Sequence, residues 1–189
     1  DIDDDPRNAK ASIGIVPQEL VFDPFFTPFE TLENQASFYG VPKAKRRTME
    51  LLEAVHLADK AHAYARTLSG GMKRRVNIGV GLLHKPRLLF MDEPTVGIDP
   101  QSRRAILDTV KDLNKNGMTV LYTTHYMEEA AELSNRVGII DHGELIALGT
   151  QDELTKQVGQ AETLILHIGE NEDPDALAKA VSSVKSVQK

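Results

Sequence analysis

Two adjacent carboxylates, Asp92 and Glu93, end an apolar run of strand length at residues 88–91, and Pro94 follows them. Open α/β sheets bind ligands at the carboxyl edge of their parallel strands, where such a pair would lie. One carboxylate there can hold Mg²⁺ and neutralise phosphate charge, while its neighbour orients or deprotonates an attacking water. The competing interpretation is a strand that stops in a turn, with both acids solvated.

A second pattern places Ser69, Gly70 and Gly71 directly before a basic, apolar-periodic helix that starts near Lys73. Glycines let backbone N–H groups approach an anion closely, the serine adds a hydroxyl donor, and the positive end of the helix points to the same place. These features suit a terminal phosphate. The residues also fit an ordinary helix start, with Ser69 as the N-cap and the glycines as turn residues.

The elements that must position these motifs alternate along the chain. Strand-like runs occur at residues 12–16, 88–91, 119–123 and 137–140. Helical patterns separate the last three runs, which favours an α/β fold with a parallel sheet and crossover helices.

A helical insertion is predicted between the first two strand-like runs. Its helices are expected at residues 31–39, 43–55 and 72–83. After Gly149 the pattern weakens, and we expect a partial C-terminal extension with a strand at 163–168 and a helix at 174–182.

Composition restricts the function classes. The 189 residues include 22 basic and 28 acidic side chains, a net charge of −6, so no nucleic-acid partner is expected. Cysteine is absent, which excludes disulfides, thiolate metal sites and a cysteine nucleophile. No apolar run reaches the roughly 18–20 residues of a membrane-spanning helix. The opening residues, 1–5, have neither a start methionine nor a signal-peptide pattern, and we interpret the chain as a fragment.

The sequence resembles the ABC ATPase family, because both motifs occur in that family's order with one helix between them. Residues 68–72 resemble its signature loop, with Met72 where glutamine is more usual, and residues 88–94 resemble its Walker B strand. Three further positions match: Gln18 of the Q-loop, Asp99 of the D-loop and His125 of the switch.

The resemblance implies a role for each matched residue. Glu93 and His125 are expected to be catalytic, and Gln18 and Asp92 are expected to bind Mg²⁺. The residues expected to contact ATP are Gln18, Ser69, Gly70, Gly71, Asp92 and Asp99. In this family the signature loop serves the nucleotide of a second ATP-binding cassette, so a paired cassette is an expected partner.

One departure from the family pattern concerns the Walker A loop. No Gly-x-x-x-x-Gly-Lys-Ser/Thr occurs in the sequence. The resemblance therefore implies a P-loop NTPase core whose first strands and phosphate loop are missing, and we expect the fragment itself to be inactive. The expected domains are a partial core at 1–20 and 84–158, a helical signature subdomain at 21–83, and the extension at 159–189.

The motif set looks like the drug, lipid and polysaccharide exporter branch of the family. It implies an ATPase at the cytoplasmic face of the membrane that powers a permease, which is expected to dock near residues 21–39. Five phenylalanines lie in that segment: Phe22, Phe25, Phe26, Phe29 and Phe38. A translation-factor type of ABC ATPase and a non-hydrolytic binding module stay open as alternatives. A chromosome-structural ATPase does not fit, because no heptad run precedes Ser69.

Overall fold

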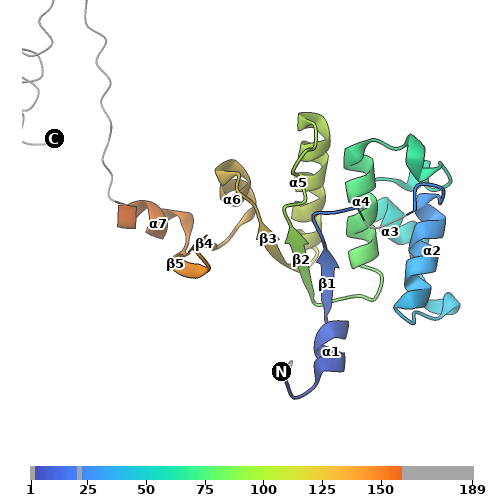
Figure 1. The fold of residues 1–189 in the computed structure, drawn as a ribbon, viewed down its shortest axis with the longest axis horizontal. Helices are drawn as coiled ribbons and strands as arrows, with labels where there is room; N and C mark the ends of the chain where they lie inside the picture. Colours follow the sequence, from blue (N-terminus) through green and yellow to red (C-terminus); the bar gives the residue numbers. More distant parts are fainter. Residues whose placement is uncertain (1–2, 21–22, 159–189) are drawn as a thin grey trace, which may run out of the picture. The chain divides into compact units, whose positions relative to one another are not determined.

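The computed structural model describes residues 3–20 and 23–158. A parallel sheet runs through the first part of the chain in the order β1 (Ile13–Val16), β2 (Leu88–Asp92) and β3 (Thr119–Thr123). Figure 1 shows the three strands side by side, although β1 and β2 are far apart in the sequence. The predicted α/β class with a parallel sheet is confirmed.

The register of the sheet decides which residues meet at its carboxyl edge. Val16 of β1 pairs with Met91 of β2, and Asp92 pairs with Thr123 of β3. The residues that leave these strands, among them Gln18 and Glu93, therefore emerge at one edge.

One face of the sheet packs against two helices, α4 (Gly70–Gly81) and α5 (Pro100–Lys115). Leu89 and Met91 of β2 are fully buried there. A Cβ added at Gly14 would lie 2.2 Å from the carbonyl oxygen of Gly81, so β1 and the end of α4 touch through their backbones. This close backbone contact fixes α4, the predicted signature helix, to the sheet.

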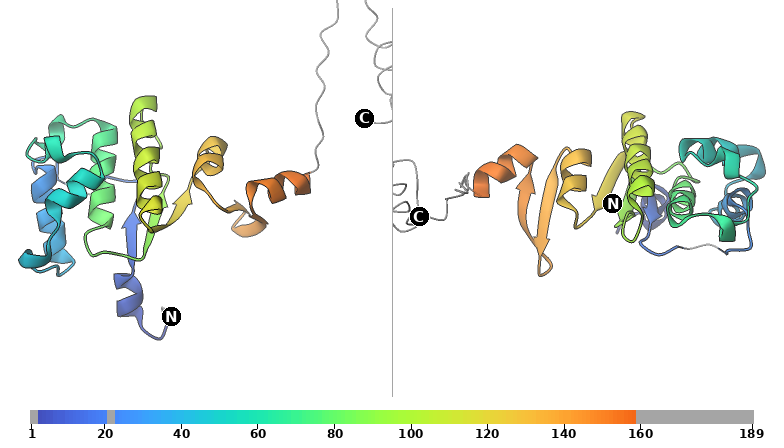
Figure 2. Two further views of the ribbon diagram at one scale, coloured as in Figure 1. Left: turned by 180° about the vertical axis from the view of Figure 1, so that it is seen from behind. Right: turned by 90° about the horizontal axis from the view of Figure 1, so that it is seen from above.

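The helical insertion is formed by α2 (Pro28–Phe38), η1 (Lys43–Lys45), α3 (Thr48–Ala54), η2 (Ala58–Lys60), η3 (Ala65–Thr67) and α4. Its fully buried side chains include Leu32 of α2, Leu52 of α3 and Ile78 of α4. They belong to the same hydrophobic cluster as Leu89 of β2. The views in Figure 2 place these helices together beside the sheet. The proposed boundaries of a separate subdomain at 21–83 stay a prediction.

The helix boundaries differ from the predicted ones for local reasons. The helix expected at 31–39 begins at Pro28, because Thr27 and Glu30 form a capping box and proline suits the first helical position. The helix expected at 43–55 is split into η1 and α3, since Arg46 between them has an extended backbone.

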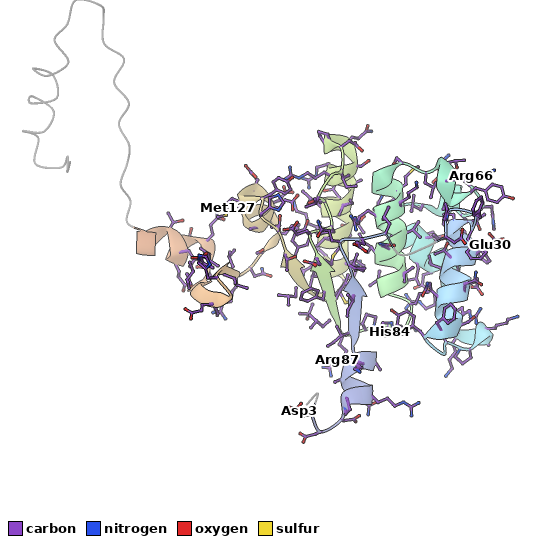
Figure 3. The ribbon with its side chains drawn as sticks, in the orientation of Figure 1. Asp3, Glu30, Arg66, His84, Arg87 and Met127 are labelled. Atoms are coloured by element: carbon purple, nitrogen blue, oxygen red, sulfur yellow. The ribbon has the colours of Figure 1, made fainter. Side chains whose placement is uncertain are left out.

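His84 connects the insertion to the sheet. Its Nε2 lies 3.0 Å from the carbonyl oxygen of Ile13, and its ring stacks on Tyr39 at a centroid distance of 4.6 Å. Figure 3 labels His84 between the sheet and the helical insertion. The end of α2 is therefore held near the start of β1.

The chain has two compact units, and the second begins at Gly138. The predicted strand at 137–140 forms as β4 (Val137–Asp141), but it pairs with β5 (Glu144–Gly149) in a two-stranded sheet, and does not join the parallel one. The connection consists of His142 and Gly143, both with positive φ, as in the tight turns that favour hairpins. This local pairing was not predicted.

Three further helices complete the described part: α1 (Pro6–Ala11) before β1, α6 (Met127–Leu133) after β3, and α7 (Gln151–Val158) after β5. Among residues 3–20 and 23–158, no helix is both long and apolar enough to cross a bilayer. The strand expected at 163–168, the helix at 174–182 and the extension at 159–189 lie outside the described residues.

Candidate functional site

Thr123 organises the two carboxylates at the end of β2. Its Oγ1 donates a hydrogen bond to Asp92 Oδ1 at 2.6 Å and accepts one from the Glu93 backbone N–H at 3.0 Å. One side chain of β3 thus fixes both residues that follow the buried part of β2. The backbone of Glu93 is left-handed, with φ 41°, which is strained for a residue with a side chain.

Glu93 and His125 face each other at the same edge. His125 Nδ1 lies 3.1 Å from Glu93 Oε1, so a proton on Nδ1 makes the ring a hydrogen-bond donor to the carboxylate. The side chain of His125 is 55% exposed and that of Glu93 is 30% exposed. Both groups therefore have access to solvent and to a substrate.

A buried carboxylate lies one helical turn beyond His125. Glu129 of α6 is only 1% exposed and accepts four side-chain hydrogen bonds. The donors are Thr95 at 2.7 Å, Arg103 at 2.6 Å, Tyr122 at 2.9 Å and Thr124 at 2.8 Å. Glu129 therefore joins the turn after β2, the end of β3 and α5.

The environment of Glu129 keeps it ionised. Burial alone would raise its pKa, but the hydrogen bonds from Thr95, Thr124, Tyr122 and Arg103 outweigh burial and lower the pKa below its ordinary value. The guanidinium of Arg103 also lies over the Tyr126 ring at 4.3 Å, and that ring packs against His125 at 4.2 Å. Arg103, which binds Glu129, thus also supports the His125 ring through Tyr126.

The predicted signature loop lies at the start of α4. Ser69 is the N-cap and its Oγ accepts the Met72 N–H at 3.2 Å, as the ordinary helix-start interpretation requires. This bond uses an oxygen lone pair and leaves the hydroxyl hydrogen able to donate. Ser69 and Gly70 are exposed, so they can still meet an external ligand.

The predicted D-loop packs against this loop. Asp99 caps α5 by accepting the Ser102 N–H at 2.9 Å, and this bond lowers the pKa of its carboxyl group. A Cβ added at Gly71 would lie 2.1 Å from Ser102 Cβ. Gly71 must therefore stay a glycine for α4 and α5 to pack as they do.

Gln18 follows β1 at this edge. It is exposed, two residues after β1, and its side chain makes no hydrogen bond to Asp92, Glu93 or His125 within the described residues. The structure therefore joins Asp92, Glu93 and His125, and it joins the loop of Ser69 to the loop of Asp99. It does not link Gln18 directly to either group.

Four supporting residues were not predicted from the sequence: Thr123, Glu129, Arg74 and Asn77. Thr123 and Glu129 flank the predicted His125 by two and four residues, the spacing of a strand end and a helix turn. Arg74 and Asn77 stand one helix turn apart in α4. That spacing was visible in the sequence, but their partners on a distant loop were not.

These features define a class of protein. It has an α/β nucleotide-binding fold with paired carboxylates and a histidine at the carboxyl edge of the sheet. Residues 1–96 match the family model described as ABC transporter, and the chain belongs to this family.

Two relatives are named as resistance ATP-binding proteins. The chain is 55% identical over 159 residues to the linearmycin resistance ATP-binding protein LnrL of Bacillus subtilis, covering 83% of this chain and 51% of that protein. It is 38% identical over 186 residues to the doxorubicin resistance ATP-binding protein DrrA of Mycobacterium tuberculosis H37Rv, covering 97% and 56%. The chain thus spans about half the length of the curated relatives that it matches.

A solved structure has the same fold. The cbiO1 protein of Clostridium perfringens, described as part of the ABC transporter complex cbiONQ, aligns with a TM-score of 0.69 and 26% identity. The alignment covers 80% of this chain and 62% of that protein.

Proposed function

We propose that this chain belongs to the ATP-hydrolysing subunit of an ABC transporter of the drug-resistance and export type. The observation that carries the proposal is the contact of Glu93 with His125 beside the Asp92–Thr123 hydrogen bond. Glu93 polarises the attacking water, and His125 holds the Glu93 carboxylate and contacts the terminal phosphate of the substrate ATP. His125 holds the Glu93 carboxylate and Thr123 holds the Glu93 backbone N–H, so little reorganisation is needed when the carboxylate acts on water.

The oxygen ligands at this edge suit Mg²⁺. Within the described residues no group of three or more His, Cys, Asp or Glu side chains could enclose a metal ion. Mg²⁺ in nucleotide sites is usually held by one or two protein ligands together with phosphates and waters, so Asp92 and Gln18 would be sufficient. When bound, the ion neutralises charge on the phosphates.

Two segments with exposed residues support the two proposed partners, a second cassette and a permease. Ser69, Gly70 and Gly71 would contact ATP held by a second cassette, with Asp99 at the same interface. A permease would dock near residues 21–39, where Phe25 is 66% and Phe26 is 42% exposed. We place the subunit peripherally, at the cytoplasmic face of the membrane. The drug-resistance names of LnrL and DrrA favour transport over a translation role.

Glu93→Gln in the full-length gene product tests the proposal. We expect ATP binding to persist while the turnover number falls at least about 100-fold, because the amide keeps the shape but cannot act as a base. Glu128→Gln, at an exposed acid on α6, is the matched control and should keep wild-type turnover. Wild-type turnover of Glu93→Gln in a steady-state phosphate-release assay would exclude the assigned role.

A further inference from the structure

Two buried side chains of α4 hold the backbone on both sides of Gln18. Arg74 Nη1 donates a hydrogen bond to the Pro17 carbonyl oxygen at 2.9 Å. Asn77 Nδ2 donates one to the Glu19 carbonyl oxygen, also at 2.9 Å. The bonds use only backbone carbonyls, so the Gln18 side chain stays free to meet a ligand.

The burial of these two groups is costly. Arg74 is 5% exposed and Asn77 is 3% exposed. Burial lowers the pKa of the Arg74 guanidinium, its Nε has no hydrogen-bond partner, and no carboxylate pairs with it within the described residues. A buried guanidinium without a carboxylate partner bears a large desolvation cost, which one hydrogen bond to a carbonyl offsets only in part. Stability alone therefore gives no reason for an arginine here.

The same helix begins at the loop of Ser69, Gly70 and Gly71. Arg74 stands about one turn after Gly70, so the carbonyl that it binds and the exposed loop are attached to one short stretch of helix. Backbone hydrogen bonds also connect the chain after Gln18 to the residues that precede the loop of Ser69. Ala65 N–H donates to Phe26 O at 2.9 Å, and Arg66 N–H donates to Pro24 O at 3.0 Å.

We propose that Arg74 and Asn77 are positioning residues that clamp the Gln18 loop to α4, so that Gln18 and the loop of residues 69–71 move as one body. The functional consequence of this inference rests on the proposed function. When a partner displaces the Gln18 loop, the position of Ser69 relative to the nucleotide of the second cassette changes. The physical link itself does not depend on ATP hydrolysis.

Backbone 15N NMR relaxation of the full-length gene product without nucleotide tests the clamp, because the clamp uses carbonyl oxygens and the amide hydrogens of residues 18–20 have no acceptor within the described residues. We expect Arg74→Met to lower the order parameters of residues 18–20 from those of a rigid backbone, about 0.85, toward those of a flexible one, below about 0.6, and to lower them also in residues 69–73. The melting temperature should fall no further than in Arg75→Met. Asn77→Ala should lower the order parameters of the same two segments less strongly, and Arg74→Lys should restore part of the order.

Arg75→Met is the matched control. Arg75 is the next residue of α4, its Nε is also without a hydrogen-bond partner within the described residues, and its guanidinium donates to carbonyls too, those of Val55 at 3.2 Å and His56 at 3.0 Å. Arg75→Met should lower the order parameters of residues 55–57 and leave those of residues 18–20 unchanged. Unchanged order parameters at 18–20 in Arg74→Met, or a change there without one at 69–73, overturn the proposal.

The ATPase assay separates this inference from the proposed function. Arg74→Met should lower turnover while Arg75→Met does not. If the wild-type protein hydrolyses no ATP, the proposed function fails, while the relaxation experiment still decides the clamp. If Arg74→Met lowers the melting temperature by more than Arg75→Met does, the arginine is a structural residue and the proposal is wrong.

Discussion

His125 has two neighbours that restrict its ring: Glu93 on one side and the Tyr126–Arg103 pair on the other. A ring held in this way contributes through geometry and hydrogen bonding. It would align the carboxylate and the terminal phosphate without adding much to the affinity for nucleotide.

The first prediction at the residue scale is that His125→Ala lowers turnover by about 100-fold or more while ATP affinity changes only slightly, because the contact matters mainly in the transition state. Stopped-flow binding and steady-state kinetics on the full-length gene product measure the two quantities. His142→Ala is the control, since its side chain is 95% exposed in the β4–β5 turn. A loss of affinity with unchanged turnover at saturation would contradict the assignment.

Glu129 allows a prediction about pH. Its pKa is lowered in the folded protein, so it contributes stability that is present above its unfolded pKa of about 4.5 and is lost as pH falls through the folded value. Glu129→Gln should therefore reduce the free energy of unfolding by about 2–3 kcal/mol at pH 7, because the charged hydrogen bond to Arg103 is lost. The difference from wild type should shrink below pH 4.5.

Urea unfolding between pH 3.5 and 8 measures this dependence. Glu128→Gln carries the same charge change on the exposed side of α6 and should follow the wild-type curve. An offset between Glu129→Gln and wild type that is constant over the whole pH range would show that the carboxylate charge plays no part.

At the scale of elements, the contact between α4 and α5 is the sharpest constraint. Gly71→Ala places a Cβ against Ser102, and we expect a loss of about 1–3 kcal/mol of unfolding free energy as the helices move apart. Gly70→Ala is the matched control, because its Cβ would meet Ile98 at an ordinary 3.5 Å. Thermal unfolding separates them, and Ser102→Gly should recover part of the loss in Gly71→Ala. Equal melting temperatures for both alanine variants would refute the packing argument.

The elements were predictable where local signals and burial agree. The run at 119–123 became β3 with no change of bounds, and residues 88–91 became β2 with Asp92 added. The pairing of β4 with β5 was missed, because alternation predicts a strand but not its neighbour. Resemblance singled out Glu93 and His125, while the partners of Arg74 depend on packing between segments distant in sequence.

At the scale of the whole molecule, the aromatic segment after Gln18 divides into exposed and packed residues. Phe25 and Phe26 are exposed, whereas Phe29 packs partly against the core and near the His62 ring. Residues 23–27 are not helical, because Pro24 and Pro28 disfavour a continuous helix through them.

Phe25→Ser with Phe26→Ser should therefore leave the basal ATPase and the melting temperature nearly unchanged, while removing co-purification with the permease. Exposed aromatic rings contribute to an interface far more than to the fold. Met127→Ser, at a residue of α6 that is 71% exposed, is the control and should keep co-purification. Unfolding of the double variant would assign the rings to the core and reject the docking site.

The continuous hydrophobic cluster has a consequence for exchanging parts between relatives. It runs from Leu32 and Leu52 in the insertion through Ile78 of α4 to Leu89 of β2 and Ile106 of α5. The insertion and the sheet share these side chains, so neither buries its apolar surface without the other. A chimera that takes residues 28–81 from a distant homologue must bring matching residues in β2 and α5 with it. The packing of the insertion and that of the sheet are therefore inherited together in this part of the chain.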